Sequence, residues 1–410
     1  MKYLVILILS LFSLLFISTT GNLFFVLSIT LTLITLLVTE NKNLVHQLLG
    51  IGYVTFVAYP YIILFYLGWQ EETLYLFYMV HFYFFFLFFL FIFSFYFFFF
   101  FLYFTKETDF SKEKIIRENV RLKKIKYYFL CLSLIGMLFL TNGDPTFFVA
   151  GAAIILLFML RYMNNFGYKD LFIYSIPYLG YIIIYSIFFW SGFGRLVLVG
   201  NIIFPLLYWL KFSRFKIGNS IIFIFSIIIG SLMSLLRFEN ESLTLDLLLK
   251  DSAVGPFILS YGMFSAKDYY QIDLSGLSEQ IQLMFFAFTP RALWTDKPIG
   301  FGRLYVDKEM DTTIFSDSHS IAALIFGDYY FFLSEYWLIG IILFSVFIIL
   351  FYRFLNHKLV SINHVALIYL PTLIWGGMAS FGARFSTGAM AILILLFIEK
   401  CLFKYIKGKK

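Results

Sequence analysis

Charged side chains are scarce in this chain of 410 residues, where Asp, Glu, Lys and Arg together make up 13%, about half the share usual in soluble proteins. Hydrophobic residues make up 61% and aromatic residues 22%, and the mean hydropathy is +0.88. A water-soluble fold of this length has too little interior to bury so much apolar surface. The composition therefore excludes a soluble enzyme, a disordered chain and a nucleic-acid-binding protein, and it predicts a protein of the lipid bilayer.

Cysteine is also rare. The two cysteines are Cys131, inside an apolar segment, and Cys401, near the basic C-terminus, so neither a disulfide framework nor a zinc-type spacing is predicted. The acids between residues 307 and 317 follow no recognised ligand spacing for a divalent ion. We predict no metal and no cofactor.

Apolar segments that approach the length of a membrane span recur along the whole chain. A spanning helix needs about 20 mainly apolar residues, and the segment at the N-terminus is interpreted as an uncleaved span because no signal-peptide cleavage site follows it. The fifth and sixth segments are separated by Asn142-Gly143-Asp144-Pro145, which predicts a helical hairpin. The expected fold is an all-α polytopic membrane protein with about twelve transmembrane helices. These are expected at 3–18, 22–39, 48–68, 73–104, 127–141, 146–160, 171–190, 194–210, 219–236, 337–355, 363–379 and 387–403.

The basic residues predict the orientation of these spans. Cytoplasmic connections of membrane proteins carry an excess of Lys and Arg, and the connection at 105–126 is rich in both, so it is assigned to the cytoplasm. Alternating sides from there places 22 of the 31 Lys and Arg residues inside, together with both termini. The net charge of +7 therefore reports topology rather than a nucleic-acid partner.

One external connection is much longer than the others. Residues 237–336 contain fourteen of the 24 acidic residues, and a loop of this length is usually functional. The sequence thus divides into a nine-span region at 1–236, a large external loop with short helices at 237–336, and a three-span region with a basic cytoplasmic tail at 337–410.

A short amphipathic helix is expected inside this loop. Residues 277–289 carry apolar side chains on one face, Ser278 is the expected N-cap, and Pro290 ends the helix. The segment is too short to span, which predicts a helix at the membrane interface or dipping partway in. Arg291, Trp294 and Lys297 follow it, and by composition alone they are typical of side chains that anchor at lipid headgroups.

The pattern Pro290-Arg291-x-x-Trp294-x-x-Lys297-Pro298 resembles the signature of the bacterial O-antigen and capsular repeat-unit polymerases, the Wzy-type family. The run from Gly327 into the next span and the later Gly382-Ala383-Arg384 resemble further family features, and the likeness covers roughly 237–390. Thr295-Asp296 departs from the more proline-rich stretch expected of the family.

The resemblance implies a membrane glycosyltransferase of GT-C type in the plasma (inner) membrane of a bacterium. Such an enzyme transfers a growing glycan between undecaprenyl-diphosphate carriers on the outer face of the membrane. The lipid diphosphate is the leaving group, so no nucleotide sugar is needed. The implied partners are the lipid-linked glycans, a flippase and a chain-length regulator.

Arginine suits the binding of a diphosphate because its planar fork contacts two oxygens at once. Arg residues at a membrane are costly and tend to be functional. The predicted diphosphate-binding residues are Arg237, Arg291 and Arg384, with Lys297 and Arg303 second to them.

An acceptor hydroxyl must lose its proton as it attacks the anomeric carbon. His319 is the one histidine assigned to the external side, and a neutral pKa suits a general base, with Asp317 two residues earlier to orient it. The simpler interpretation of His319 is an exposed loop residue, and Asp296, Asp328 and Glu335 are alternative bases.

Three other functional classes are compatible with the hydropathy pattern. A flippase or transporter of lipid-linked oligosaccharide is expected to show related halves and charged or broken helices within the membrane, neither of which is visible in the sequence. An O-antigen ligase would share the diphosphate chemistry and differ in its acceptor. A membrane acyltransferase is less favoured, because His81 has no accompanying polar cluster.

Overall fold

The computed structural model describes residues 48, 60, 61, 64, 120–163, 168–190, 198, 200–202, 255–266, 270–309, 322–358 and 360–407. Every regular element in these ranges is a helix, and none is a strand. The predicted spans at 3–18, 22–39, 73–104 and 219–236 lie outside the described residues. The helices are α6 (Val120–Leu140), α7 (Pro145–Met163), α8 (Tyr168–Phe188), α12 (Gly255–Ser265), α13 (Leu274–Phe286), α14 (Phe301–Glu309), α15 (Ile325–Leu333), the 3-10 turn η5 (Ser334–Tyr336), α16 (Trp337–Lys358) and α17 (Val360–Lys407).

Two stretches of the described chain are long and apolar enough to cross a bilayer. They are Gly327–Tyr352, which joins α15, η5 and α16, and Gly376–Cys401 within α17. Shorter apolar helices cover Ile125–Leu140, Pro145–Met159 and Ile173–Phe188. The all-helical prediction is confirmed for the described residues, while the number of twelve spans and the GT-C fold stay predictions.

The hairpin expected at residues 142–145 is present. Asn142 and Gly143 adopt positive φ values of 49° and 68°, and α7 begins at Pro145, which fits the first turn of a helix. The Asp144 carboxylate accepts a hydrogen bond from the backbone N–H of Thr146 at 2.7 Å, so it caps the new helix. Local turn chemistry therefore sets the antiparallel pairing of α6 and α7.

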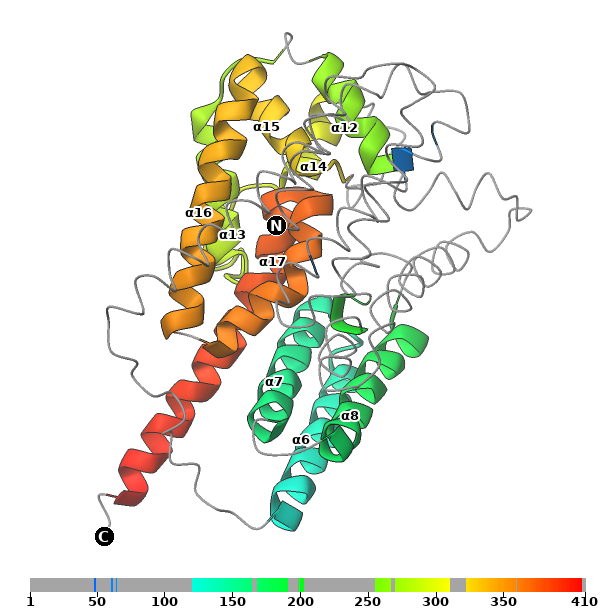
Figure 1. Ribbon diagram of the computed structural model, residues 1–410, viewed down its shortest axis with the longest axis vertical. Helices are drawn as coiled ribbons and strands as arrows, with labels where there is room; N and C mark the ends of the chain where they lie inside the picture. The colour runs from blue at the N-terminus through cyan, green and yellow to red at the C-terminus, as the bar shows by residue number, and fades with distance from the viewer. Residues whose placement is uncertain are drawn as a thin grey trace, which may run out of the picture.

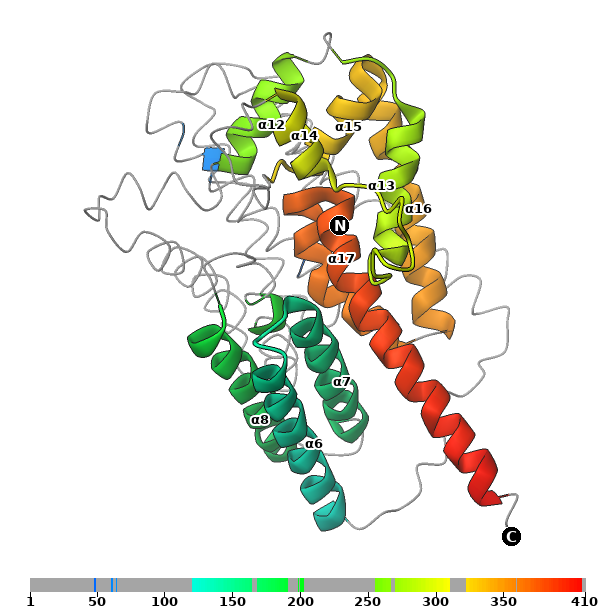
Figure 2. The same ribbon diagram turned by 180° about the vertical axis from the view of Figure 1, so that it is seen from behind.

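Two groups of helices make up the described fold. Helices α6, α7 and α8 lie together, and α7 packs against α17, which also contacts α13, α15 and α16. In both Figure 1 and Figure 2, α12, α14 and α15 lie at the end opposite the C-terminus and the start of α6. Of the short helices in the predicted external segment, α12, α14 and α15 are thus far from the basic tail, while α13 runs alongside α16 and α17.

The outward faces of α6 and α16 are strongly apolar. Large hydrophobic side chains at helical spacing are exposed on both helices, and such a surface is expected where a helix meets lipid rather than water. On α6 they are Ile125, Phe129 and Leu132, and on α16 they are Ile339, Leu343, Leu350 and Phe354.

The connection expected between residues 379 and 387 lies earlier, at Gly377. Two helical halves of α17 meet there, and they lie antiparallel, because Gly388 of the second half packs against Val365 of the first. Arg384 therefore lies within the second helical half and not in the connection. The small residues that suggest a turn instead allow close helix packing. A Cβ at Gly382 would overlap the backbone of Met284, and one at Gly388 would press on Val365 and Ala153.

The break in α17 is formed jointly with α15. Gly377 has φ 71° and ψ −167°, a conformation that residues with a Cβ rarely adopt. The backbone N–H of Met378, the first residue after the break, donates to Oδ2 of Asp328 at 2.9 Å. Asp328 therefore caps the second half of α17 from a neighbouring helix, as an anion at a helix N-terminus should.

Candidate functional site

Helix α13 carries the predicted motif at its C-terminal end. It begins at Leu274 with Asp273 as N-cap, and the carboxylate accepts from the N–H of Gly276 at 2.8 Å. The expected start at Leu277 with Ser278 as N-cap is wrong, because Asp273 supplies a charged acceptor one turn earlier. This hydrogen bond, with another from the Ser275 hydroxyl, lowers the pKa of Asp273.

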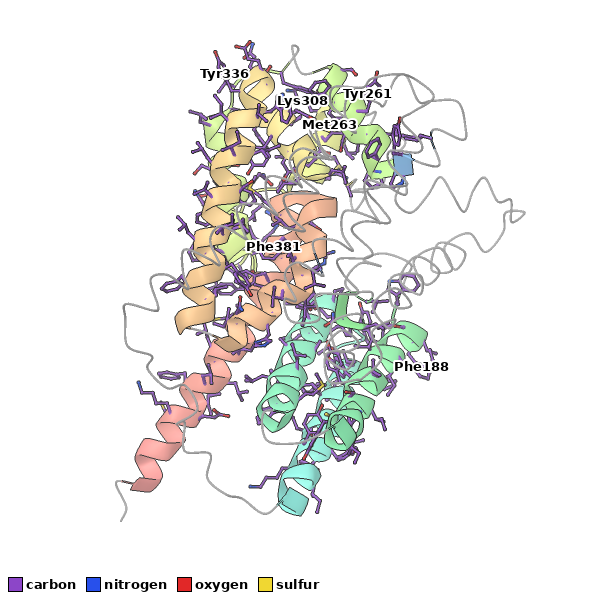
Figure 3. The ribbon with its side chains drawn as sticks, viewed as in Figure 1. Phe188, Tyr261, Met263, Lys308, Tyr336 and Phe381 are labelled. Carbon is purple, nitrogen blue, oxygen red and sulfur yellow. The ribbon has the colours of Figure 1, made fainter. Side chains whose placement is uncertain are left out.

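The later half of α13 packs against α17 and meets α16 through aromatic rings. The ring of Phe285 meets those of Phe347 and Phe351 edge to face, with centroids 6.0 and 5.4 Å away. Figure 2 shows α13 running alongside α16 and α17, and Phe381 lies between these two longer helices in Figure 3. The C-terminal end of α13 thus lies beside Phe347 and Phe351 of α16. Both belong to the stretch Gly327–Tyr352, which is long enough to span a bilayer.

Two contacts fix α13 on the second half of α17. Gly382 leaves room for the backbone of Leu283 and Met284 to approach. Four residues later, the Ser386 Oγ accepts from the backbone N–H of Phe288 at 3.1 Å. Gly382 and Ser386 therefore define one face of α17 that holds the end of α13.

Residues 287–300, the motif loop, connect α13 to α14. Gln280 closes this loop from within α13, since its side-chain amide donates to the carbonyl of Ile299 at 3.1 Å and accepts from the N–H of Phe301 at 3.0 Å. The Gln280 side chain is fully buried, so both amide groups are used where an unpaired one would be costly. Gln280 thus holds the end of the motif loop against the helix from which the loop begins.

Lys297 holds the other side of the motif loop. Its Nζ donates to the carbonyl oxygens of Ala287 at 2.6 Å and Thr289 at 2.9 Å, which satisfies orphan acceptors just past the end of α13. Burial, together with the neighbouring charge of Arg291, lowers the pKa of Lys297. Lys297 thus has a structural role in the loop that the sequence did not predict.

Arg291 lies beside Lys297, and most of its guanidinium N–H groups remain available to a ligand. Its Nη1 donates to the carbonyl of Lys297 at 3.0 Å, and neither cation forms an ion pair within the described ranges. Leu293, between them in sequence, is 81% exposed. The motif loop therefore presents two neighbouring positive charges and an apolar side chain on a closed backbone.

The neighbours of the Arg384 side chain are not residues of the motif loop. Its Nη1 donates to Ser380, one turn earlier in α17, and it interacts electrostatically with Tyr369. Tyr369 accepts from Asn201 at 3.3 Å, and Asn201 accepts from the Tyr178 hydroxyl at 2.7 Å. Residues two apart on a helix point in nearly opposite directions, so Arg384 faces away from Gly382 and Ser386. The structure does not bring Arg384 and Arg291 together.

The remaining predicted residues are placed as follows. Arg303 pairs with Asp307 one turn later in α14 at 2.8 Å. Asp328 is fully buried and caps α17, so it is not accessible to a hydroxyl from solvent. Arg237, Asp317 and His319 lie outside the described residues.

Sequence reasoning missed Gln280 and Ser386. Each has a polar neighbour, Glu279 before Gln280 and Thr387 after Ser386, and such short polar runs are equally typical of an exposed position. Their burial gives them a role, and no local pattern in the sequence predicts that burial. A comparison of the chain with protein-family models, with curated proteins and with solved structures finds no match.

Proposed function

We propose that the protein is a membrane glycosyltransferase that polymerises undecaprenyl-diphosphate-linked oligosaccharide units into a surface polysaccharide. The proposal places it in the plasma membrane of a bacterium, with both termini in the cytoplasm and the motif loop on the outer side. The composition, the two stretches long enough to span and the exposed apolar faces of α6 and α16 support the membrane location.

The pair Arg291 and Lys297 is the observation that carries this proposal. Two cations without a carboxylate partner repel each other, and an anion of high charge between them relieves that repulsion. The planar guanidinium suits two oxygens of a diphosphate, and the Lys297 ammonium adds a third contact. The exposed Leu293 suits the hydrocarbon chain of a lipid that carries such a headgroup.

The proposed reaction transfers the glycan from this diphosphate to the hydroxyl of a second lipid-linked unit. The bond between the anomeric carbon and the phosphate oxygen breaks, the hydroxyl oxygen bonds to that carbon, and its proton passes to a base. His319, oriented by Asp317, remains the proposed base. Arg237, Arg303 and Arg384 remain proposed diphosphate-binding residues, with Arg384 acting apart from the motif loop.

Deletion of the gene should leave a surface glycan that stops at one repeat unit, which a gel of the extracted glycan measures. A flippase would instead leave no unit at the surface while lipid-linked units accumulate inside. A ligase would leave polymer on the lipid carrier. An unaltered ladder in the deletion strain would exclude all three functions.

The proposed topology makes a separate prediction. Reporter fusions after residues 115 and 213 should be active in the cytoplasm, and a fusion after residue 270 should be active on the outer side, because basic connections remain inside. A fusion at 270 that reports from the cytoplasm would contradict both the topology and an external motif loop.

A transporter of lipid-linked oligosaccharide is the second candidate, and one observation favours it. The sequence suggested no charge within a helix, yet the fully buried Asp328 lies against Gly377, where the two halves of α17 meet at the start of the apolar stretch Gly376–Cys401. Buried charges at the ends of half-helices are typical of transporters. The deletion experiment separates this candidate from the polymerase.

A further inference from the structure

The break in α17 collects hydrogen-bond acceptors. In an unbroken helix the N–H of Met378 would donate to the carbonyl of Ile374, and here it donates to Asp328 Oδ2 instead. The last carbonyls of the first half of α17 therefore lose regular donors at the same place where a carboxylate enters.

Asp328 places at this break a carboxylate oxygen that has no described hydrogen-bond partner. The residue is fully buried, and its Oδ1 has no hydrogen-bond partner within the described part of the chain. Both carboxylate oxygens approach the α carbon of Gly377 so closely that a Cβ there would overlap them. Oδ1 thus points into the break and not toward solvent.

No described charge balances this carboxylate. The polar side chains on the helices packed around it are engaged elsewhere: Ser260 of α12 with Pro256 and Leu324, and Gln280 of α13 with the motif loop. On α17, the Arg384 cation donates to Ser380. The described cations of α14 are also engaged, Arg303 with Asp307 and Lys308 above the rings of Tyr270 and Phe331. The N–H of Met378 and the N-terminus of the second half of α17 compensate only part of a full negative charge. A buried carboxylate in this position is expected to bind a positive charge, because an uncompensated one costs several kcal/mol.

We propose that the α17 break binds one small monovalent cation, shared between Asp328 Oδ1 and backbone carbonyls released at Gly377. One carboxylate matches a single positive charge, and oxygen atoms are the ligands that hard cations prefer. Either Na⁺ or a proton would supply that charge, and either would give the unpaired acceptors at the break a positively charged partner. The proposal does not depend on the glycan chemistry of the motif loop.

The test is thermal unfolding of the purified full-length protein in detergent, followed by tryptophan fluorescence. Replacing choline chloride by NaCl at constant ionic strength should raise the melting temperature by roughly 2–4 °C if Na⁺ is bound. Lowering the pH from 8 to 6 in choline chloride should raise it if a proton is bound. Asp328→Asn should abolish either response, because Asn still accepts from Met378 but carries no charge.

Glu335→Gln is the matched control, since it removes an exposed carboxylate from the same apolar stretch and should keep the response. A wild-type protein that responds to neither Na⁺ nor pH would overturn the proposal, whatever the variant does. An Asp328→Asn protein that responds as the wild type does would overturn it as well. A Na⁺ response alone assigns Na⁺, and a pH response alone assigns the proton.

Discussion

Arg291→Lys should lose polymerisation nearly as completely as Arg291→Ala. Lysine keeps the charge but not the planar fork, which donates to the Lys297 carbonyl and under the proposed function also binds two diphosphate oxygens. Loss of one charged contact to the leaving group should cost on the order of 3 kcal/mol of transition-state stabilisation, or roughly a hundredfold in rate. The measurement is polymer formed per amount of protein, from membranes supplied with lipid-linked units.

The alternative role for Arg291 is an anchor at lipid headgroups, where Lys serves as well as Arg. Full-length polymer from Arg291→Lys at normal protein level would support that role and exclude the diphosphate contact. Lys308→Ala is the control, because this cation of α14 lies above the rings of Tyr270 and Phe331, away from the motif loop. It should retain polymerisation.

Gly382→Ala should displace α13 and the motif loop from α17. The added methyl group would overlap the backbone of Met284 and the carbonyl of Leu283, and main-chain atoms cannot turn aside as a flexible side chain does. Such overpacking costs about 1–3 kcal/mol, so the melting temperature should fall by about 2–6 °C. A displacement of about 1 Å in the loop costs roughly a hundredfold in rate, which the polymerisation assay measures.

Gly180→Ala is the matched control for this substitution. Gly180 lies within α8, and a Cβ there meets no atom of the described residues within 4 Å. Alanine is the better helix former, so Gly180→Ala should leave the melting temperature unchanged or raise it slightly. A Gly382→Ala protein with the same melting temperature and polymer yield as the wild type would show that the approach of α13 to α17 is not needed.

Features set by neighbouring residues were predictable from the sequence. The turn at Asn142-Gly143-Asp144-Pro145 is one, because positive φ values, a cap and a proline at the first helical position are all local. The existence of α13 is another, since it follows from helical periodicity, but the helix begins and ends three residues earlier than expected, at Leu274 and Phe286.

Features that depend on distant contacts were not predictable. The stretch from Met378 to Gly388 has the composition of a turn, and only the approach of α13 and α7 explains why it is helical. The roles of Gln280, Ser386 and Asp328 likewise depend on burial by segments far away in the chain. The direction of Arg384 depends on distant contacts as well, because sequence gives no direction around a part of a helix that is not expected to exist.

The motif loop is held by main-chain groups at nearly every point. Lys297 binds two carbonyl oxygens, Arg291 binds a third, and Gln280 binds one carbonyl and one N–H. Backbone atoms are the same in every amino acid, so exchange of Ala292, Leu293 or Thr295 leaves these hydrogen bonds in place. The loop can therefore keep its shape while most of the residues between Arg291 and Lys297 are exchanged during evolution. Relatives of this protein are better sought by a Gln within the preceding helix and by the two cations than by overall identity.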